Sequence, residues 1–415
     1  MACTSHPTCD AHEPTALAWP VRLDEEMRLA RFPRPVVLLA FTSLFADISS
    51  EMLYPVLPLF LTTRLSAPAS VVGLVEGIAE ATQNIVQGGS GALADRLRRN
   101  KPLALFGYAL AALAKPAIGL AAGWPQVLGG RFVDRLGTGI RSAPRDALIA
   151  NSIEPRRRGA AFGLEGVGDN LGAVLGPLIA AGLLYTLHID LRLIFLVAFV
   201  PGLLALVLVT FVQETPAKTG RSLASGVSIR GFPSGYWRYL IAVSLFGIGS
   251  SSKAFIILKA TDVGIAAEQT LLVYAGFNLV AALASYPAGA LSDRWGRKRL
   301  LLGTLGVFAL AYGGFTVTSS ALLFAALFVL YGLHQGAFRA VGKALAVDLV
   351  PPELRASGVG LYGTAVGLSA LVASVVGGLL WDRLGPAATF GYGAVCAVIG
   401  AAVFALFVPP PSRRS

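Results

Sequence analysis

The sequence predicts an all-α integral membrane protein with twelve transmembrane helices, arranged in two pseudo-symmetric six-helix bundles with both termini in the cytoplasm. Three observations support this fold class. The 415-residue chain is 55% hydrophobic and only 14% charged, whereas soluble domains carry about 25% charged residues. Apolar segments of roughly 20 residues, the length that crosses a bilayer, recur along nearly the whole chain. Finally, blocks of sequence repeat between the two halves.

The basic residues set the predicted topology. Most of the 34 Lys and Arg residues lie in the tails and the even-numbered loops, whereas Arg64, Arg192, Lys259 and Arg383 alone lie in or beside odd-numbered loops. By the positive-inside rule both termini are cytoplasmic. The net charge of +11 is therefore a topology signal, and no nucleic-acid partner is predicted. The predicted helices cover about residues 36–63, 70–93, 103–122, 126–150, 160–186, 191–212, 238–260, 269–291, 300–320, 322–349, 356–381 and 386–408.

A long polar stretch with Pro, Gly, Ser and basic residues divides the chain in the middle. The first 35 residues contain no apolar core of signal-peptide length, so we expect no cleaved signal. Three cysteines give no disulfide framework. The expected organisation is a cytoplasmic tail, a first bundle, a central cytoplasmic loop, a second bundle and a short tail, at residues 1–35, 36–212, 213–237, 238–408 and 409–415.

Two blocks of sequence recur at nearly one offset. "GALADR" at Gly91–Arg96 aligns with "GALSDR" at Gly289–Arg294. "EPRRRGAAFGLEG" at Glu154–Gly166 aligns with "PPELRASGVGLYG" at Pro351–Gly363. Duplicated halves with a site between them near the bilayer midplane are typical of transporters.

Over about residues 36–408 the chain resembles a transporter of the major facilitator superfamily. The family's loop motif Gly-x3-Asp-Arg-x-Gly-Arg-Arg/Lys is complete in the second half, but the first copy has Arg98 for glycine and Asn100 for a base. An Asp in this loop can pair with Arg and accept hydrogen bonds from a helix N-terminus, which would latch one transport state. Ordinary topogenic charge is the alternative. The predicted gating residues are Gly91, Asp95, Arg96, Gly289, Asp293, Arg294 and Arg297.

The fifth predicted helix carries Gly168, Gly172, Gly176-Pro177 and Gly182. Their spacing resembles a motif of the family's exporters, which are mostly proton antiporters, although the closing glycine pair is missing. Small residues at every fourth position also allow close helix packing, which is the alternative explanation. We assign Gly172, Gly176 and Pro177 to a helix-packing motif.

Many ionisable residues lie within the predicted helices. Such groups cost roughly 2.5–3.5 kcal/mol each on insertion scales, so they face partners or water and suggest function. Asp47 and Glu51 share one face of the first helix. We predict that they line a central cavity and that at least one exchanges a proton, with Arg131 or Arg135 as countercharge. A static buried network is the alternative. The predicted proton-coupling residues are Asp47, Glu51, Glu80, Arg131, Asp134 and Arg135.

The second half carries mainly basic residues at membrane depth. A cavity with acids on one wall and Lys253, Arg339 and Lys343 on the other would suit an anionic or zwitterionic solute and would repel a lipophilic cation. The predicted substrate-cavity residues are Tyr54, Asp169, Lys253, Gln335, Arg339 and Lys343.

The N-terminal tail holds Cys3, His6, Cys9 and His12 at three-residue steps. Thiolate and imidazole are ligands for zinc and similar metals. The spacing is not that of a common zinc module, and Met27 is an alternative start. If real, the site favours export of a metal or metal chelate.

The expected function is proton-coupled export of a small organic solute by a monomer in the cell (inner or plasma) membrane, with protons, lipid and the solute as partners and no cofactor. No Gly-x4-Gly-Lys-Ser/Thr loop is present, so ATP drive is not supported. An enzyme is disfavoured, because no Ser/His/Asp set lies in the helices. A proton-coupled importer, a metal exporter and a non-transporting sensor are the alternatives.

Overall fold

The computed structural model describes residues 32–97, 99–154, 157–214, 231–351 and 354–409, with side chains left undescribed at 91–97 and 355–356. The described chain is helical. The helices are α2 (Arg34–Leu53), α3 (Val56–Leu59), the π-helix η1 (Phe60–Arg64), α4 (Ala69–Leu97), α5 (Asn100–Gly119), α6 (Trp124–Asn151), α7 (Arg158–Leu187), α8 (Leu191–Thr210), α9 (Ser234–Gly247), α10 (Lys253–Asp262), α11 (Ala267–Trp295), α12 (Arg297–Val317), α13 (Ala321–Asp348), α14 (Arg355–Leu384) and α15 (Pro386–Phe407).

These helices form twelve rods, because α2, α3 and η1 follow one another, as do α9 and α10. This confirms the predicted all-helical membrane class. Within the described residues, nine rods are long and apolar enough to span a membrane. The other three are α4 and α6, which carry several ionisable residues, and the interrupted rod of α9 and α10.

The first and seventh rods are each interrupted partway along their length. Pro55 follows α2 and supplies no backbone N–H, so the helix ends there and restarts as α3. In the seventh rod, the sequence predicted one continuous helix over 238–260. Instead, Ile248–Ser252 separates α9 from α10, and the Ser252 hydroxyl caps α10 by accepting from the Ala254 N–H at 3.2 Å. Glu51 and Lys253 lie directly beside these two breaks.

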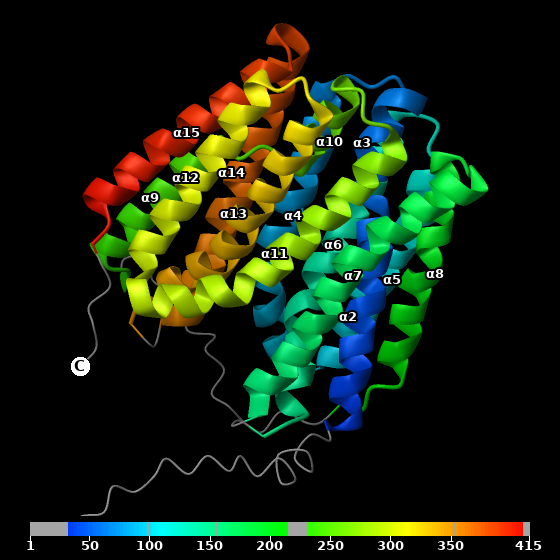
Figure 1. Cartoon of the computed structure of the whole chain (residues 1–415). Coiled ribbons are helices and arrows are strands. Elements are labelled where there is room, and N and C mark those ends of the chain that lie inside the picture. Colours follow the sequence, from blue (N-terminus) through cyan, green and yellow to red (C-terminus); the bar gives the residue numbers. More distant parts are fainter. Residues whose placement is uncertain (1–31, 98, 155–156, 215–230, 352–353, 410–415) are drawn as a thin grey trace, which may run out of the picture.

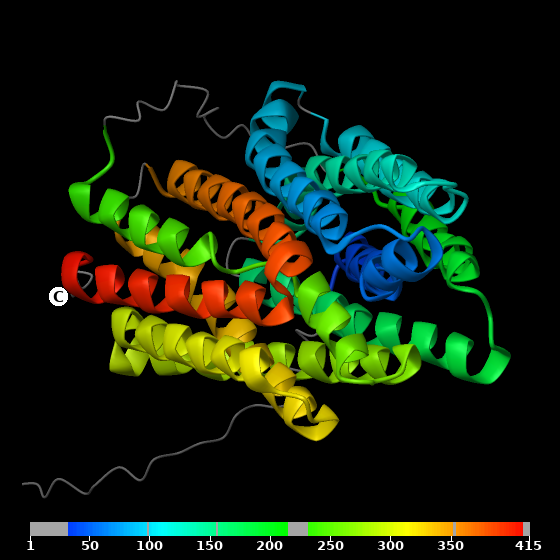
Figure 2. The same ribbon diagram turned by 90° about the horizontal axis from the view of Figure 1, so that it is seen from above.

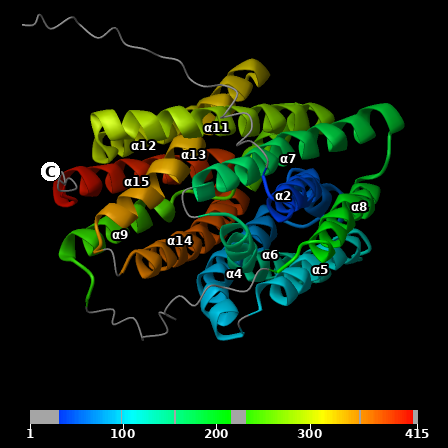
Figure 3. The ribbon, with the colours of Figure 1, turned by 90° about the horizontal axis from the view of Figure 1, so that it is seen from below.

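The rods pack as two bundles, the first from α2–α8 and the second from α9–α15 (Figures 1 and 3). In the first bundle α2 packs on α7 and α8, and α6 packs on α4 and α5. In the second, α13 packs on α11 and α12, and α15 packs on α9 and α12. The bundles meet mainly through two helix pairs, α4 with α14 and α7 with α11, as the view from above also shows (Figure 2).

We call the end at which α2 begins the inner end, which is cytoplasmic in the predicted topology, and the opposite end the outer end. The bundles are joined at the outer end and separate at the inner end (Figure 1). A Cβ on Gly73 of α4 would lie 2.1 Å from the Ser374 carbonyl oxygen of α14. Further in, the approach is looser: a Cβ on Gly88 would lie 3.9 Å from the Thr364 hydroxyl oxygen of α14, and one on Gly89 would have no neighbour within 4 Å. This asymmetry describes an outer-closed state.

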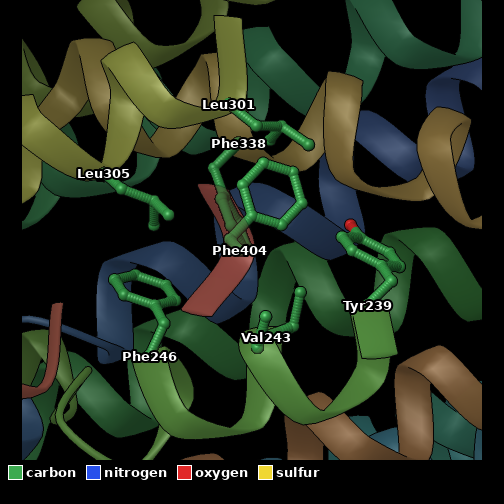
Figure 4. Close-up of a pocket in the computed structure, with 8 residues that line it drawn as sticks. Tyr239, Val243, Phe246, Leu301, Leu305, Phe338 and Phe404 are labelled. Atoms are coloured by element: carbon green, nitrogen blue, oxygen red, sulfur yellow. The ribbon is translucent and has the colours of Figure 1, made fainter. Parts of the chain in front are cut away.

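The second bundle has an aromatic core that leaves little free space. Figure 4 shows one cavity, lined by Tyr239, Phe246, Leu301, Phe338 and other apolar side chains. Its free volume is about 10 Å³, room for at most about one water molecule. The Tyr239 hydroxyl beside it already donates to the Gly342 carbonyl at 2.9 Å. This cavity is therefore a packing defect and not a solute site.

Candidate functional site

A fully buried charge network joins α4, α5 and α6. The guanidinium of Arg131 donates to Glu76 at 3.0 Å and to Asp134 at 2.9 Å. Lys115 donates to Asp134 at 3.4 Å and to the Ala111 carbonyl at 2.9 Å. Four charged side chains here are at most 4% exposed, namely Arg131, Asp134, Glu76 and Lys115. We call these four residues the buried network.

Arg135 extends this network toward α4. Its guanidinium lies 3.4 Å from the Asp134 carboxylate and donates to Gln83 at 2.9 Å. Within the described chain, every ionised group here has a partner of opposite charge. A satisfied network in which each charge is paired is what a buried structural element requires.

A second cluster joins α2, α6 and α7 nearer the inner end. Arg145 bonds Glu165 at 2.7 Å and Ser43 at 3.0 Å, and lies 3.8 Å from Asp169. Asp47 faces this cluster, within electrostatic range of Asp169, Arg145 and Arg141.

Arg141 stands apart from these pairs. It is 6% exposed, and its Nε and one terminal nitrogen have no hydrogen-bond partner among the described residues. Its guanidinium stacks 4.3 Å from the ring centroid of Tyr108, whose hydroxyl is also unpartnered there. Buried guanidinium nitrogens without bonds are costly, and the Asp47 carboxylate lies within electrostatic range of this group. Asp47 and Arg141 are thus close but not joined.

The third cluster bridges the bundles around Glu51. The Glu51 carboxylate accepts from the Tyr274 hydroxyl at 2.9 Å and from the Asn278 amide at 3.3 Å. Asn278 also donates to the Ala173 carbonyl of α7 at 2.7 Å. Lys253 donates to the same Tyr274 hydroxyl at 3.2 Å. The result is a chain Lys253–Tyr274–Glu51 that crosses from the second bundle to the first, and we call it the bridge.

Aromatic rings surround the Lys253 ammonium. It lies 4.7 Å from the ring centroid of Tyr54 and 5.3 Å from those of Tyr274 and Phe277. Tyr54 stacks on Tyr274 across the bundles with centroids 5.7 Å apart, and its hydroxyl lies 3.1 Å from that of Ser252. Cation–π contacts of this kind contribute about 0.5–2 kcal/mol each.

In the described part of the chain, no carboxylate forms an ion pair with Lys253, Arg339 or Lys343. Lys253 is nevertheless within electrostatic range of Glu51 and Glu80. Arg339 and Lys343 are exposed although they lie in a membrane helix, and so is Glu80. Because charged side chains avoid lipid, their exposure indicates an aqueous space.

The structure thus separates the predicted residues. Arg131, Asp134 and Arg135 lie together, Asp47 lies with Asp169, and Glu51 lies with Tyr54 and Lys253. Sequence reasoning did not assign Glu76, Lys115, Arg141, Tyr274 or Asn278. Membrane depth marked the charged three as candidates, but no signal in one sequence shows which helices face each other.

The glycines of α7 pack against α2. A Cβ on Gly172 would lie 2.7 Å from the Cβ of Asp47, and one on Gly176 would lie 2.8 Å from the Ile48 carbonyl oxygen. Pro177 is buried beside them. This contact fixes the position of the helix face that carries Asp47.

At the inner end, Arg297 joins Asp348 of α13 at 2.8 Å and lies 3.8 Å from Asp293. Arg294 is exposed, and a Cβ on Gly289 would meet nothing within 4 Å. Gly91, Asp95 and Arg96 have undescribed side chains. Cys3, His6, Cys9 and His12 lie outside the described residues, and the described part contains no group of three or more metal-ligating side chains.

The sequence profile of the Major Facilitator Superfamily matches residues 39–258 and 239–415. An uncharacterised MFS-type transporter of Methanocaldococcus jannaschii is 34% identical over 373 residues, covering 88% of this chain and 92% of that protein. A protein of Cupriavidus pinatubonensis described as a probable 4-methylmuconolactone transporter is 28% identical over 369 residues, 85% of each chain. The crystal structure of the nucleoside transporter NupG is similar in fold, with a TM-score of 0.78 at 11% identity, covering 90% of this chain and 100% of that one.

The fold and the charged interior define a multi-pass membrane protein of the secondary-transporter class, whose members are generally non-enzymatic carriers of small molecules. The profile match covers both halves and the archaeal relative is matched over most of its length. The chain therefore belongs to the Major Facilitator Superfamily.

Proposed function

We propose that this protein exports a small anionic or zwitterionic organic solute across the inner or plasma membrane in exchange for protons. The observation that carries the proposal is a set of three cations without an ion pair among the described residues, Lys253, Arg339 and Lys343. Lys253 lies within electrostatic range of Glu51 and Glu80, and Lys343 lies within range of Asp146. Lys253 is half-buried, an unpaired charge at membrane depth is costly, and a carboxylate or phosphate on a solute would offset that cost. Arg339 and Lys343, which face the aqueous space, would add attraction for the same group. A lipophilic cation would meet three repelling groups.

The outer-closed arrangement sets how such a solute would enter. With α4 and α14 in contact at the outer end, access is from the inner end, where Arg339 and Lys343 are exposed. These two residues on α13 would attract the solute first. Lys253, beside the break in the seventh rod, would hold its anionic group next to the bridge.

The bridge supplies a physical means of proton coupling. As a carboxylate, Glu51 accepts hydrogen bonds from Tyr274 and Asn278 of the second bundle. A proton on Glu51 removes its charge, and hydrogen bonds to a charged acceptor are roughly twice as strong as neutral ones. Protonation therefore weakens the contact between the bundles, and deprotonation restores it. A solute anion bound to Lys253 would compete with Glu51 for the same cation.

Asp47 is the second candidate for proton exchange. The Arg141 guanidinium, two of whose nitrogens have no partner among the described residues, lies within electrostatic range of Asp47. It would favour the ionised form of Asp47 in one transport state and move away from it in the other. The buried network, by contrast, is assigned a structural role in this proposal, because its pairs are complete in the described chain and it has no exposed member.

The export direction rests on the glycine pattern of α7. Gly-x3-Gly-x3-Gly-Pro resembles the motif of exporters in this family. The contact of Gly172 and Gly176 with α2 is compatible with either direction, so the direction needs its own measurement.

A ligand-stabilisation screen tests the substrate class. The purified protein is melted with succinate as an anion, alanine as a zwitterion and tetraphenylphosphonium as a lipophilic cation. 4-Methylmuconolactone is added because one relative carries its name. A compound at a hundred times its dissociation constant adds about 2.7 kcal/mol of stability. We expect an anion or a zwitterion to raise the melting temperature.

The Lys253→Gln variant should lose this shift. Lys259→Gln is the matched control, because Lys259 lies on the same helix α10 but pairs with Asp262 at the outer end. Stabilisation by tetraphenylphosphonium alone, or an anion shift that survives Lys253→Gln, would contradict the proposed substrate class.

A further inference from the structure

One sequence pattern occurs at both ends of the second bundle. "GALSDRWG" at Gly289–Gly296 and "GLLWDRLG" at Gly378–Gly385 share Gly-x3-Asp-Arg-x-Gly. The first joins α11 to α12 at the inner end, and the second joins α14 to α15 at the outer end. The closing glycines Gly296 and Gly385 have φ of 91° and 87°, values that only glycine adopts readily. Both copies therefore build the same helix–turn–helix corner.

The outer copy holds the first bundle by a backbone contact. The Asp382 carboxylate accepts from the Ala69 N–H at 2.9 Å with one oxygen and from the Ser70 N–H at 2.9 Å with the other. These are the first two residues of α4, whose N–H groups have no partner within the helix. A carboxylate there also interacts favourably with the helix dipole. Asp382 thus caps a helix of the opposite bundle.

The glycine that opens the motif allows this approach. A Cβ on Gly378 would lie 2.6 Å from the Ser70 Cα and 2.8 Å from the Ala69 carbonyl oxygen. The first turn of α4 therefore lies directly against α14. Any movement that parts the bundles at the outer end must break both bonds to Asp382.

In this outer-closed state, the inner copy of the motif makes no bond to the first bundle among the described residues. The Asp293 side chain is 71% exposed, and its nearest described ionic partner is Arg297, one turn ahead, at 3.8 Å. Arg297 itself is bound to Asp348 within the second bundle. Among the described residues, one copy of the motif is bonded across the bundles, while the Asp of the other copy has an ionic partner only within its own bundle.

We propose that Asp382 is a positioning residue of the transport cycle, which latches the outer ends of α14 and α4 in the outer-closed state and releases them in the outer-open state. The motif then supplies one corner at each membrane face. This inference rests on the alternating-access part of the proposed function and adds a residue that the solute and the protons do not touch.

The test measures the outer distance directly by double electron–electron resonance in the full-length protein. Spin labels go on Ala122 and Ser319, which are exposed at the outer ends of the first and second bundles, after the native cysteines are replaced by alanine. Asp382→Ala should raise the ratio of outer-open to outer-closed protein about fivefold, the effect of losing a helix cap of about 1 kcal/mol. Asp382→Asn keeps one acceptor and should give a smaller increase.

Arg383→Gln is the matched control, since Arg383 is the next residue, is exposed and makes no described bond to α4. Gly378→Ala is a second route to the same state, because its methyl group would push Ser70 away. An unchanged ratio in both Asp382→Ala and Gly378→Ala, in a protein whose wild type shifts with pH, would overturn the latch. A wild type held at one distance at every pH would contradict the proposed function as well.

Discussion

Loss of one charge from the buried network gives the sharpest test of its role. Asp134 is 1% exposed and contacts three cations, Arg131 at 2.9 Å, Lys115 at 3.4 Å and Arg135 at 3.4 Å. In Asp134→Asn, Arg131 keeps Glu76, whereas Lys115 and Arg135 lose their carboxylate partner among the described residues. Breaking a buried pair by removing one partner typically costs about 3–5 kcal/mol. We expect a loss of that size.

A second substitution tests the origin of this loss. Lys115→Met in the Asp134→Asn background removes a buried cation that has lost its partner, and should recover about 0.5–3 kcal/mol, the range of coupling energies between contacting groups. Lys115→Met alone should be destabilising, because it leaves Asp134 with fewer partners. The rescue should therefore appear as a non-additive term in a double-mutant cycle.

The assay is thermal melting of the four proteins in one detergent at one scan rate, since membrane proteins of this size unfold irreversibly and melting points depend on scan rate. The order expected is wild type, then the double variant, then Asp134→Asn. An Asp134→Asn protein that melts like the wild type but no longer moves protons would refute the structural assignment and place the network in the coupling machinery.

Two further changes test the bridge and the packing of α7. Tyr274→Phe keeps the ring stacked on its neighbours but removes the hydroxyl that joins Lys253 to Glu51. Solute-driven proton movement should therefore fall about tenfold, the effect of ~1.5 kcal/mol, with little change in melting temperature. Normal proton movement in liposomes would argue against the bridge. Gly172→Leu should prevent folding or strongly reduce the yield in membranes, because a Cβ at this position would already lie 2.7 Å from α2. Gly182→Leu on the same helix should express normally, because a Cβ there would have no neighbour within 4 Å. Equal yields of the two would contradict the observed contact.

The helical membrane fold was predictable because its signals are local. Segment length, loop charge and the repeated blocks each need only neighbouring residues, and they predicted twelve rods and a duplicated architecture. The break in the seventh rod was also visible in principle, since Gly247-Ile-Gly-Ser-Ser-Ser252 is poor in helix-forming residues. The expected helix nevertheless included this break, because apolar residues flank it on both sides and keep the mean hydropathy of the segment high.

The pairing of charges was not predictable, because it depends on which helix faces meet. Arg131 was expected to serve Asp47 or Glu51 as a countercharge, but the packing of α6 on α4 directs it to Glu76. Glu51 instead meets Tyr274 and Asn278, which belong to the other bundle. That contact depends on how the two bundles are inclined in one state, and no spacing within a helix encodes such an angle.

The depth of a charge was predictable where its partner was not. Lys253 and Glu51 were expected at similar depths in opposite halves, and they lie beside corresponding helix breaks and share Tyr274. Asp169 was expected to line one cavity with Lys253, which stays a prediction, and the partner that the structure gives it is Arg145 of the first bundle. A four-residue spacing assigns a side chain to a helix face, but the neighbouring helices decide what that face contacts.

Proton movement by reconstituted protein tests the central claim most directly. Liposomes that contain wild type, Glu51→Gln or Glu268→Gln are loaded with a pH-sensitive dye. The compound that stabilised the protein in the melting screen is then added outside. Glu268→Gln is the control, because Glu268 lies at the outer end of α11. The account predicts solute-dependent proton movement opposite to the solute in the wild type and Glu268→Gln, and uncoupled or absent movement in Glu51→Gln. Equal proton movement in all three proteins, or movement of solute and protons in the same direction, would contradict it.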